Sequence, residues 1–266
     1  MQQKRIAIIG GGNLGKAIAT GIIKSGEFAP ESITVTRRRT EQLEDIKALG
    51  ANVHSDNSKA VREADVVILA LKPYKVGEIL QEVSAEIDVE KQLIISVVTG
   101  VKIETLTKSL GKPGRIARVM PNTAIAVAQS MSCIATNDST TPEDLVFIKH
   151  LFNLLGETEH IQEELMEAAT VLAASGIAFA LRYIRANMQG GIQIGFDTKL
   201  ALHIATQTVK GAAELLLQNG LHPEEEIDKV TTPMGITIAG IIEMEHQGFS
   251  SSLIRGIATS YDKIGK

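Results

Sequence analysis

A glycine-rich turn directly after the first apolar run constrains the fold more than any other feature of this sequence. Residues 5–9 (RIAII) form a short, almost wholly apolar run, which is typical of a central parallel strand. Residues 10–15 (GGGNLG) follow at once and open a stretch of helical character that continues to Lys24. A strand, a G-x-G-x-x-G turn and a helix in this order predict the first unit of a dinucleotide-binding domain.

The glycines of this turn have separate predicted roles. Gly10 permits the tight turn, Gly12 lets the backbone approach a pyrophosphate, and Gly15 lets the helix pack closely on the strand. The N-terminus of the helix presents free N–H groups and a partial positive charge to the phosphates. We therefore expect a dinucleotide to be held by Gly10, Gly12, Asn13, Leu14 and Gly15.

The end of the second apolar run indicates which dinucleotide is preferred. Proteins that bind NAD usually carry an acidic residue there, which accepts hydrogen bonds from the adenosine ribose. In this chain residues 33–36 are followed by Arg37, Arg38 and Arg39. Guanidinium groups bind a 2′-phosphate bidentately, so the sequence predicts NADPH held by Arg37 and Arg38, with NADH use also possible. The alternative is that the three arginines are only a solvated loop.

Strand-like and helix-like segments alternate through the first part of the chain, and helical periodicity dominates after Pro142. Further apolar runs lie at residues 65–71 and 93–98, and residues 131–135 are expected to form the last full strand. We predict an α/β fold with an N-terminal Rossmann-type doubly wound sheet and a C-terminal all-helical dimerisation domain. The predicted ranges are 1–160 for the NADP-binding domain and 161–266 for the helical, substrate-binding domain.

The helical part is apolar on more than one face. Residues 168–175 (AATVLAAS) have almost no polar side. A helix that is apolar all round must be buried, and a helical domain of about 100 residues has few interior positions. We therefore expect a homodimer or a larger homo-oligomer that assembles through this domain.

Charge and cysteine content argue against several classes of function. A net charge of −4 argues against nucleic-acid binding, and the single cysteine, Cys133, excludes an internal disulfide and carries no metal-ligand spacing. Residues 168–181 are interrupted by Ser175 and Gly176 and are shorter than the roughly 20 residues that cross a bilayer. The first strand leaves no room for a signal peptide. We expect a cytoplasmic protein without a metal or a membrane partner, acting on a small molecule.

Several later segments resemble the pyrroline-5-carboxylate reductase family, over nearly the whole chain. These segments are residues 69–73 (LALKP), 118–123 (RVMPNT), 205–213 (ATQTVKGAA) and, most specifically, 230–240 (VTTPMGITIAG). The last is similar to a family signature with Ser-Pro-Gly-Gly-x-Thr at its centre. The resemblance implies reduction of 1-pyrroline-5-carboxylate to L-proline by hydride transfer from NADPH, a step of proline biosynthesis.

The resemblance also implies site residues. Thr237 takes the catalytic role by hydrogen-bonding the ring nitrogen of the substrate. The start of the helix after Pro233 is a ready anion site for the substrate carboxylate. The substrate residues are then Ser175, Gly176, Met234, Gly235, Ile236 and Thr237, and the further cofactor residues are Ala70, Lys72, Pro73, Met120 and Asn122. The alternatives are that Thr232 or Thr237 merely caps this helix, and that Ser175 and Gly176 only pack helices together.

Departures from the family pattern keep other functions open. Met234 stands where the family normally has Gly, and Ile177 stands where it normally has Pro. One alternative is a related NADP-dependent imine or β-hydroxy-acid oxidoreductase. Enzymes acting on hydroxy acids generally need a lysine on the long helix, where this chain has Arg182 and Arg185. The other alternative is a non-catalytic NADP-binding regulatory dimer.

Overall fold

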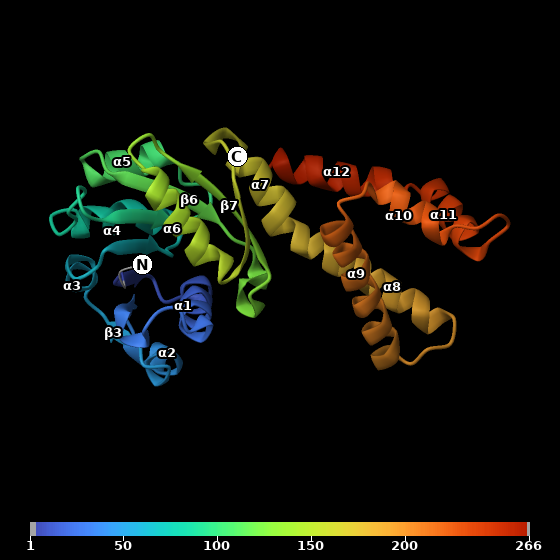
Figure 1. The fold of residues 1–266 in the computed structure, drawn as a ribbon, viewed down its shortest axis with the longest axis horizontal. Coiled ribbons are helices and arrows are strands. Elements are labelled where there is room, and N and C mark those ends of the chain that lie inside the picture. Colours follow the sequence, from blue (N-terminus) through green and yellow to red (C-terminus); the bar gives the residue numbers. More distant parts are fainter. Residues whose placement is uncertain (1–3, 265–266) are drawn as a thin grey trace. The chain divides into compact units, whose positions relative to one another are not determined.

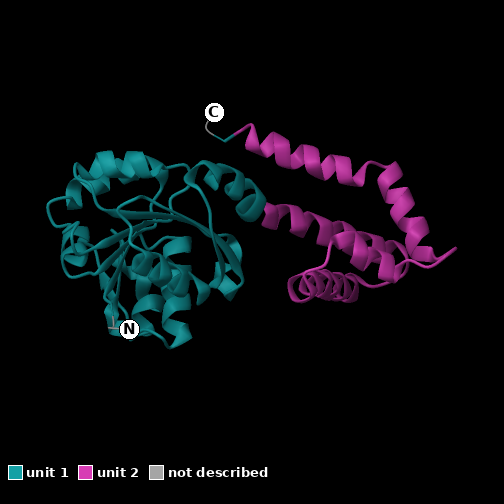
Figure 2. Ribbon diagram, turned by 45° about the horizontal axis from the view of Figure 1, so that its top comes forward, with its two compact units in different colours: residues 1–175, 264–266 teal, residues 176–263 magenta. Residues whose placement is uncertain are grey.

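The computed structural model describes residues 4–264 and divides them between two compact units (Figure 2). The larger unit ends at Ser175, and the smaller unit comprises Gly176–Lys263. The segment after residue 160 contacts the larger unit, because Met166 packs in one cluster with Met120 and Cys133. The boundary between the two compact units therefore differs from the predicted boundary between the NADP-binding domain, 1–160, and the helical domain, 161–266. The predicted domain ranges stay a prediction.

The larger unit is built on an eight-stranded sheet of order β3-β2-β1-β4-β5-β6-β7-β8 (Figure 1). The strands are β1 (Ile6–Ile9), β2 (Ile33–Thr36), β3 (Asn52–His54), β4 (Val66–Leu69), β5 (Leu93–Ser96), β6 (Arg115–Met120), β7 (Ser130–Thr136) and β8 (Gly156–His160). Strands β1 to β6 pair in parallel, β7 runs antiparallel to β6, and β8 runs parallel to β7. The predicted Rossmann-type doubly wound sheet is confirmed.

Strand β8 was not expected from the sequence. Its residues, GETEH, lack the apolar alternation that marks a half-buried strand, because β8 lies at the edge of the sheet. Gly156 has φ +143, and a Cβ there would lie 2.1 Å from the carbonyl oxygen of Ser130. Close backbone packing against β7, rather than an apolar pattern, therefore fixes this strand.

Helices cover both faces of the sheet (Figure 1). They are α1 (Asn13–Ser25), α2 (Glu44–Ala48), α3 (Asn57–Arg62), α4 (Val76–Val83), α5 (Ile103–Leu110), α6 (Pro142–Asn153) and α7 (Met166–Ala169), with 3₁₀ turns η1 (Pro30–Ser32), η2 (Thr40–Leu43), η3 (Pro73–Lys75), η4 (Thr123–Val127) and η5 (Glu163–Leu165). Ile6 and Ile8 of β1 pack in the core with α1 and α6. Ala7 and Ile9 face the opposite core, with α3, α4 and α5. Because both faces are buried, β1 reads as a continuous apolar run.

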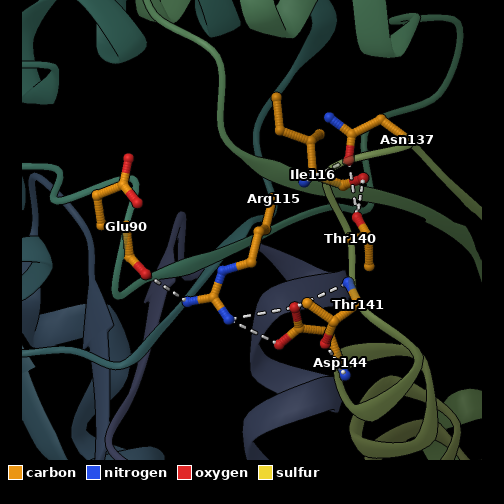
Figure 3. Close-up of polar contacts among 7 residues, drawn as sticks. All are labelled: Glu90, Arg115, Ile116, Asn137, Thr140, Thr141 and Asp144. Atoms are coloured by element: carbon orange, nitrogen blue, oxygen red, sulfur yellow. Dashed lines mark hydrogen bonds and ion pairs between the residues drawn. The ribbon is translucent and has the colours of Figure 1, made fainter.

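A buried polar cluster ties α6 to the end of the sheet (Figure 3). Thr141 and Asp144 form a capping box at the start of α6. The Asp144 carboxylate also accepts two bonds from Nη1 of Arg115 on β6, at 3.0 and 3.2 Å. The Asn137 carboxamide oxygen accepts from the Ile116 backbone N–H at 3.2 Å, so strands and helix share one network.

The smaller unit is entirely helical. A π-helical segment, η6 (Thr170–Ser175), leads into α8 (Gly176–Gln193), which is followed by α9 (Thr198–Asn219), α10 (Pro223–Val230), α11 (Ile236–His246) and α12 (Phe249–Tyr261). Asp197 caps α9 by accepting from the N–H groups of Lys199 and Leu200, and Gly220 ends α9 in the left-handed region. Within Gly176–Lys263, only Ala201 and Ala205 are buried, so this unit of one chain has almost no core of its own.

The apolar residues 168–181 are part of a longer helix. This helix continues through Ser175 and Gly176, which interrupt only the apolar sequence. The whole helix, Glu163–Gln193, has 31 residues and an apolar window of mean hydropathy 1.5, so by length and composition it is long enough to cross a membrane. The same composition is found in soluble core helices that a partner subunit covers.

Candidate functional site: a dinucleotide groove and a helix N-terminus

A groove of about 1010 Å³ lies at the carboxyl ends of the parallel strands. It is lined by residues 10–14, 36–39, 42, 55, 57, 70–75, 79, 97 and 99. These segments follow β1, β2, β3, β4 and β5, whose carboxyl ends meet at one edge of the sheet. In doubly wound folds this edge is where ligands bind.

The glycine turn forms one wall of the groove, and its geometry matches a pyrophosphate. A Cβ at Gly10 would lie 2.4 Å from the Ala70 carbonyl oxygen, and one at Gly15 would lie 2.1 Å from the Gly10 carbonyl oxygen. A Cβ at Gly12 would meet nothing within 4 Å. Gly12 is the N-cap of α1 and makes no side-chain cap bond. The first amides of α1 therefore face open space beside Gly12, where an anion can approach the backbone.

The arginines after β2 have two different environments. Arg37 is half-buried, and its Nη1 donates to the Gly11 carbonyl oxygen at 2.7 Å, so it braces the glycine turn. Arg38 is largely exposed, and its Nη2 lies 3.5 Å from Oε1 of Glu78. Lys75 pairs with the other oxygen of Glu78, and Lys75 and then Arg38 lower the pKa of that carboxyl below its usual value. Arg38 is thus the freer of the two arginines predicted to bind a 2′-phosphate.

The structure separates the predicted cofactor residues into two groups. Nine of them line the groove, namely Gly10, Gly12, Asn13, Leu14, Arg37, Arg38, Ala70, Lys72 and Pro73. The other three, Gly15, Met120 and Asn122, are buried and do not line it. Met120 is nevertheless close, because its Sδ accepts from the Thr99 hydroxyl at 3.8 Å, and Thr99 lines the groove.

Sequence reasoning missed several polar residues of the groove. The Thr36 hydroxyl donates to Oδ1 of Asn57 at 2.7 Å, and both residues line the groove with Ser55, Lys75 and Thr99. All of these residues stand at or shortly after the carboxyl end of a parallel strand. Their position at the carboxyl end of a strand could have identified them as groove residues from the sequence.

The predicted substrate segment opens α11. Met234 has φ +57 and a fully exposed side chain, so it adopts the left-handed conformation that suits the glycine found there in the resembling family. Gly235 is the N-cap of α11 and makes no side-chain cap bond, so neither Thr232 nor Thr237 caps this helix. Ile236 and Thr237 are the first residues of α11, and both are exposed. The helix therefore begins with amides that no side chain satisfies.

The other two predicted substrate residues are consecutive in the chain, where the larger unit ends and the smaller unit begins. Ser175 is the last residue of the π-helical segment, and Gly176 is the first residue of α8. Neither is fully exposed.

Two family models match the chain. One, described as pyrroline-5-carboxylate reductase dimerisation, matches residues 163–266. The other, described as NADP oxidoreductase coenzyme F420-dependent, matches residues 5–100. The two matches fall on the helical part and on the strands and helices that form most of the groove.

Solved structures share the fold. A pyrroline-5-carboxylate reductase from Coxiella burnetii is 28% identical, with a TM-score of 0.93, over 99% of this chain and 98% of that chain. A pyrroline carboxylate reductase from Plasmodium falciparum, solved with NADP bound, is 24% identical, with a TM-score of 0.87, over 99% of this chain and 97% of that one.

Curated relatives match nearly the full length of the chain. Pyrroline-5-carboxylate reductase 1 of Dictyostelium discoideum is 45% identical over 97% of this chain, which spans only 49% of that longer relative. Pyrroline-5-carboxylate reductase 2 of the same organism is 41% identical, over 99% of this chain and 93% of the relative. The enzyme of that name from Methanosarcina acetivorans is 39% identical, over 99% and 97%. On this similarity, the chain belongs to the pyrroline-5-carboxylate reductase family.

Proposed function

We propose that this chain reduces 1-pyrroline-5-carboxylate to L-proline with NADPH, in the cytoplasm, as a homodimer or larger homo-oligomer. The observation that carries the proposal is the groove, with an open glycine turn and a basic rim, in a chain of this family. NADPH, when bound, supplies the hydride that the imine carbon takes up. The protein's part is then to bind, orient and exclude water.

The residues of the groove fit NADPH. The free amides beside Gly12 suit the pyrophosphate, and a Cβ there would fill the space that the phosphates need. Arg38 and Arg39 are exposed at the rim and suit the 2′-phosphate, while Arg37 holds the turn in shape. Arginines rather than an acidic residue stand directly after β2, so NADH binds without the 2′-phosphate contacts and more weakly.

The N-terminus of α11 suits the substrate carboxylate. The uncapped amides of Ile236 and Thr237 offer donors and the positive end of the helix dipole to an anion, whereas the Gly235 N–H already donates to the Thr232 carbonyl oxygen at 2.9 Å. The Thr237 hydroxyl then orients the ring nitrogen. The protonated imine is already electrophilic. The protein therefore needs to orient the substrate and does not need to supply a strong acid. Ser175 and Gly176 are small, and in this proposal they let the long helix approach the substrate closely.

Assembly through the helical part is supported by its exposed apolar surface. Leu217 is 78% exposed, Ile242 63% and Leu172 70% in a single chain. Burying apolar side chains of this size stabilises an assembly by about 1.5–3 kcal/mol each. The match to a dimerisation model over residues 163–266 favours a second copy, rather than a membrane, as the cover. Sedimentation without detergent tests this, and a monodisperse monomer would contradict it.

The enzymatic test is NADPH oxidation with 1-pyrroline-5-carboxylate and direct detection of L-proline. Six-membered cyclic imines and β-keto acids serve as control substrates. Turnover of β-keto acids but not of cyclic imines would favour the hydroxy-acid alternative. Tight NADPH binding without any turnover would favour the regulatory dimer.

Thr237 is tested by two variants. Thr237→Ala should lose about 10- to 100-fold in kcat/KM, because one hydrogen bond made in the transition state is worth about 1–3 kcal/mol. Thr237→Ser keeps the hydroxyl and should retain most of the activity. Wild-type rates from Thr237→Ala would remove Thr237 from the mechanism.

A further inference from the structure

A π-helical segment interrupts the long helix just before Ser175. Residues Thr170–Ser175 form η6, between α7 and α8. A π-helical turn is an uncommon, poorly favoured variant of the α-helix, and it occurs frequently at functional sites. A segment of this kind persists only where its surroundings support it.

Asn122 supplies such support from the neighbouring sheet. This residue follows β6 and is 7% exposed. Its Nδ2 donates to the carbonyl oxygen of Ala173, inside the π-helical segment, at 3.4 Å. Its Oδ1 accepts from the Ala124 N–H at 3.0 Å, and its own N–H donates to the buried Ser130 hydroxyl at 3.0 Å. The Asn122 side chain is thus bonded at both ends within the protein.

Contacts also connect this asparagine to the groove. Thr99 lines the groove, and its hydroxyl donates to Met120 Sδ at 3.8 Å. Met120 packs with Met166 and Ala169 at the start of the long helix. Asn122 lies two residues beyond Met120, and its side chain bonds to Ala173, in the following part of that helix. It therefore stands between the groove and the π-helical segment.

We propose that Asn122 is a positioning residue that holds the π-helical segment and thereby places Ser175 for the substrate, and that it does not bind NADPH. The inference rests on the proposed function. An α-helix turns by about 100° per residue, so relaxation of the segment by one residue would turn Ser175 away by that angle. The bond from Nδ2 to Ala173 opposes this relaxation.

Two variants of Asn122 remove the donor end of its carboxamide and keep an acceptor, and a third variant elsewhere in the chain is the control. Asn122→Asp keeps an acceptor for the Ala124 N–H but cannot donate to Ala173 at neutral pH. Asn122→Ser, another favoured cap that is too short to reach Ala173, is the second such variant in case the aspartate impairs folding. Thr107→Val is the matched control, because it removes a side-chain bond to the Ile103 carbonyl in α5, away from the groove.

The measurements are KM and kcat for the imine, Kd for NADPH by fluorescence titration, and thermal stability. Loss of this bond should raise the KM for the imine about 10-fold, while Kd for NADPH stays within about twofold. Thr107→Val should change neither constant. A merely structural role would lower the active fraction, and so the apparent kcat, at unchanged KM.

Two results would overturn the inference. One is an unchanged KM in both Asn122→Asp and Asn122→Ser. The other is a weakening of NADPH binding as large as the rise in KM, which would mean that Asn122 contacts the cofactor. Failure of the proposed function itself looks different, because the wild-type chain would then not turn over the cyclic imine.

Discussion

A buried ion pair fastens the start of the long helix to the sheet, and its removal gives the sharpest stability prediction. Nη1 of Arg118, on β6, lies 2.8 Å from Oε1 of Glu163. The same oxygen accepts from the Ile103 N–H, at the first turn of α5, at 2.7 Å. The Arg118 side chain is 4% exposed, and its Nε is buried without a hydrogen-bond partner. Glu163 is therefore the main compensation for the Arg118 charge.

The change Glu163→Ala leaves that charge buried and unpaired. Breaking a buried pair in this way costs about 3–5 kcal/mol. Glu163 is 27% exposed, so water reaches the site in part and we expect the lower end, about 3 kcal/mol. At about 2–4 °C per kcal/mol for a protein of this size, the midpoint of unfolding should fall by about 6–12 °C.

Thermal unfolding followed by circular dichroism, at one fixed protein concentration because the oligomer couples to stability, is the assay. Glu164→Ala removes an exposed neighbouring carboxylate, so it should change the midpoint little. Adding Arg118→Met to Glu163→Ala should recover much of the loss, because replacing a buried pair by apolar groups is often neutral. A fall no larger than that of Glu164→Ala, or no recovery in the double variant, would refute the reasoning.

Three further predictions concern the two candidate binding sites. Arg38→Ala should weaken the binding of NADPH about 10-fold or more and the binding of NADH little. Arg37→Ala should weaken the binding of both dinucleotides, because Arg37 donates to the Gly11 carbonyl oxygen of the glycine turn. Equal weakening of NADPH and NADH binding by Arg38→Ala would show that Arg38 does not bind the 2′-phosphate. Gly12→Ala should fold normally but bind NADPH at least about 10-fold more weakly, whereas Gly15→Ala should lower the unfolding midpoint as well, because its Cβ would meet the Gly10 carbonyl oxygen. Met234→Gly should raise the midpoint by about 2–8 °C, since a left-handed non-glycine residue costs about 1–2 kcal/mol; a lowered midpoint would contradict this.

The features of this protein that could be predicted from the amino-acid sequence are those that are contiguous along the chain. Strand β1, its glycine turn and α1 are one local pattern, and Gly10, Gly12 and Gly15 each meet the steric environment expected of them. The arginines directly after β2, in the place of an acidic residue, and the all-helical end were equally local features. Family resemblance was also readable from the sequence, because its most specific motif is a single run at residues 230–240.

Contacts between residues that are distant in the sequence could not be predicted in this way. Sheet order brings Thr36 and Asn57 into one groove, and it turns Arg37 inward to Gly11 rather than outward to solvent. The bond from Asn122 to Ala173 joins residues 51 positions apart. Hydrophobic periodicity reports which face of one element is buried, but it carries no information on which element lies against that face. Contacts of this kind depend on strand order and crossover, and these are settled only when the chain is packed.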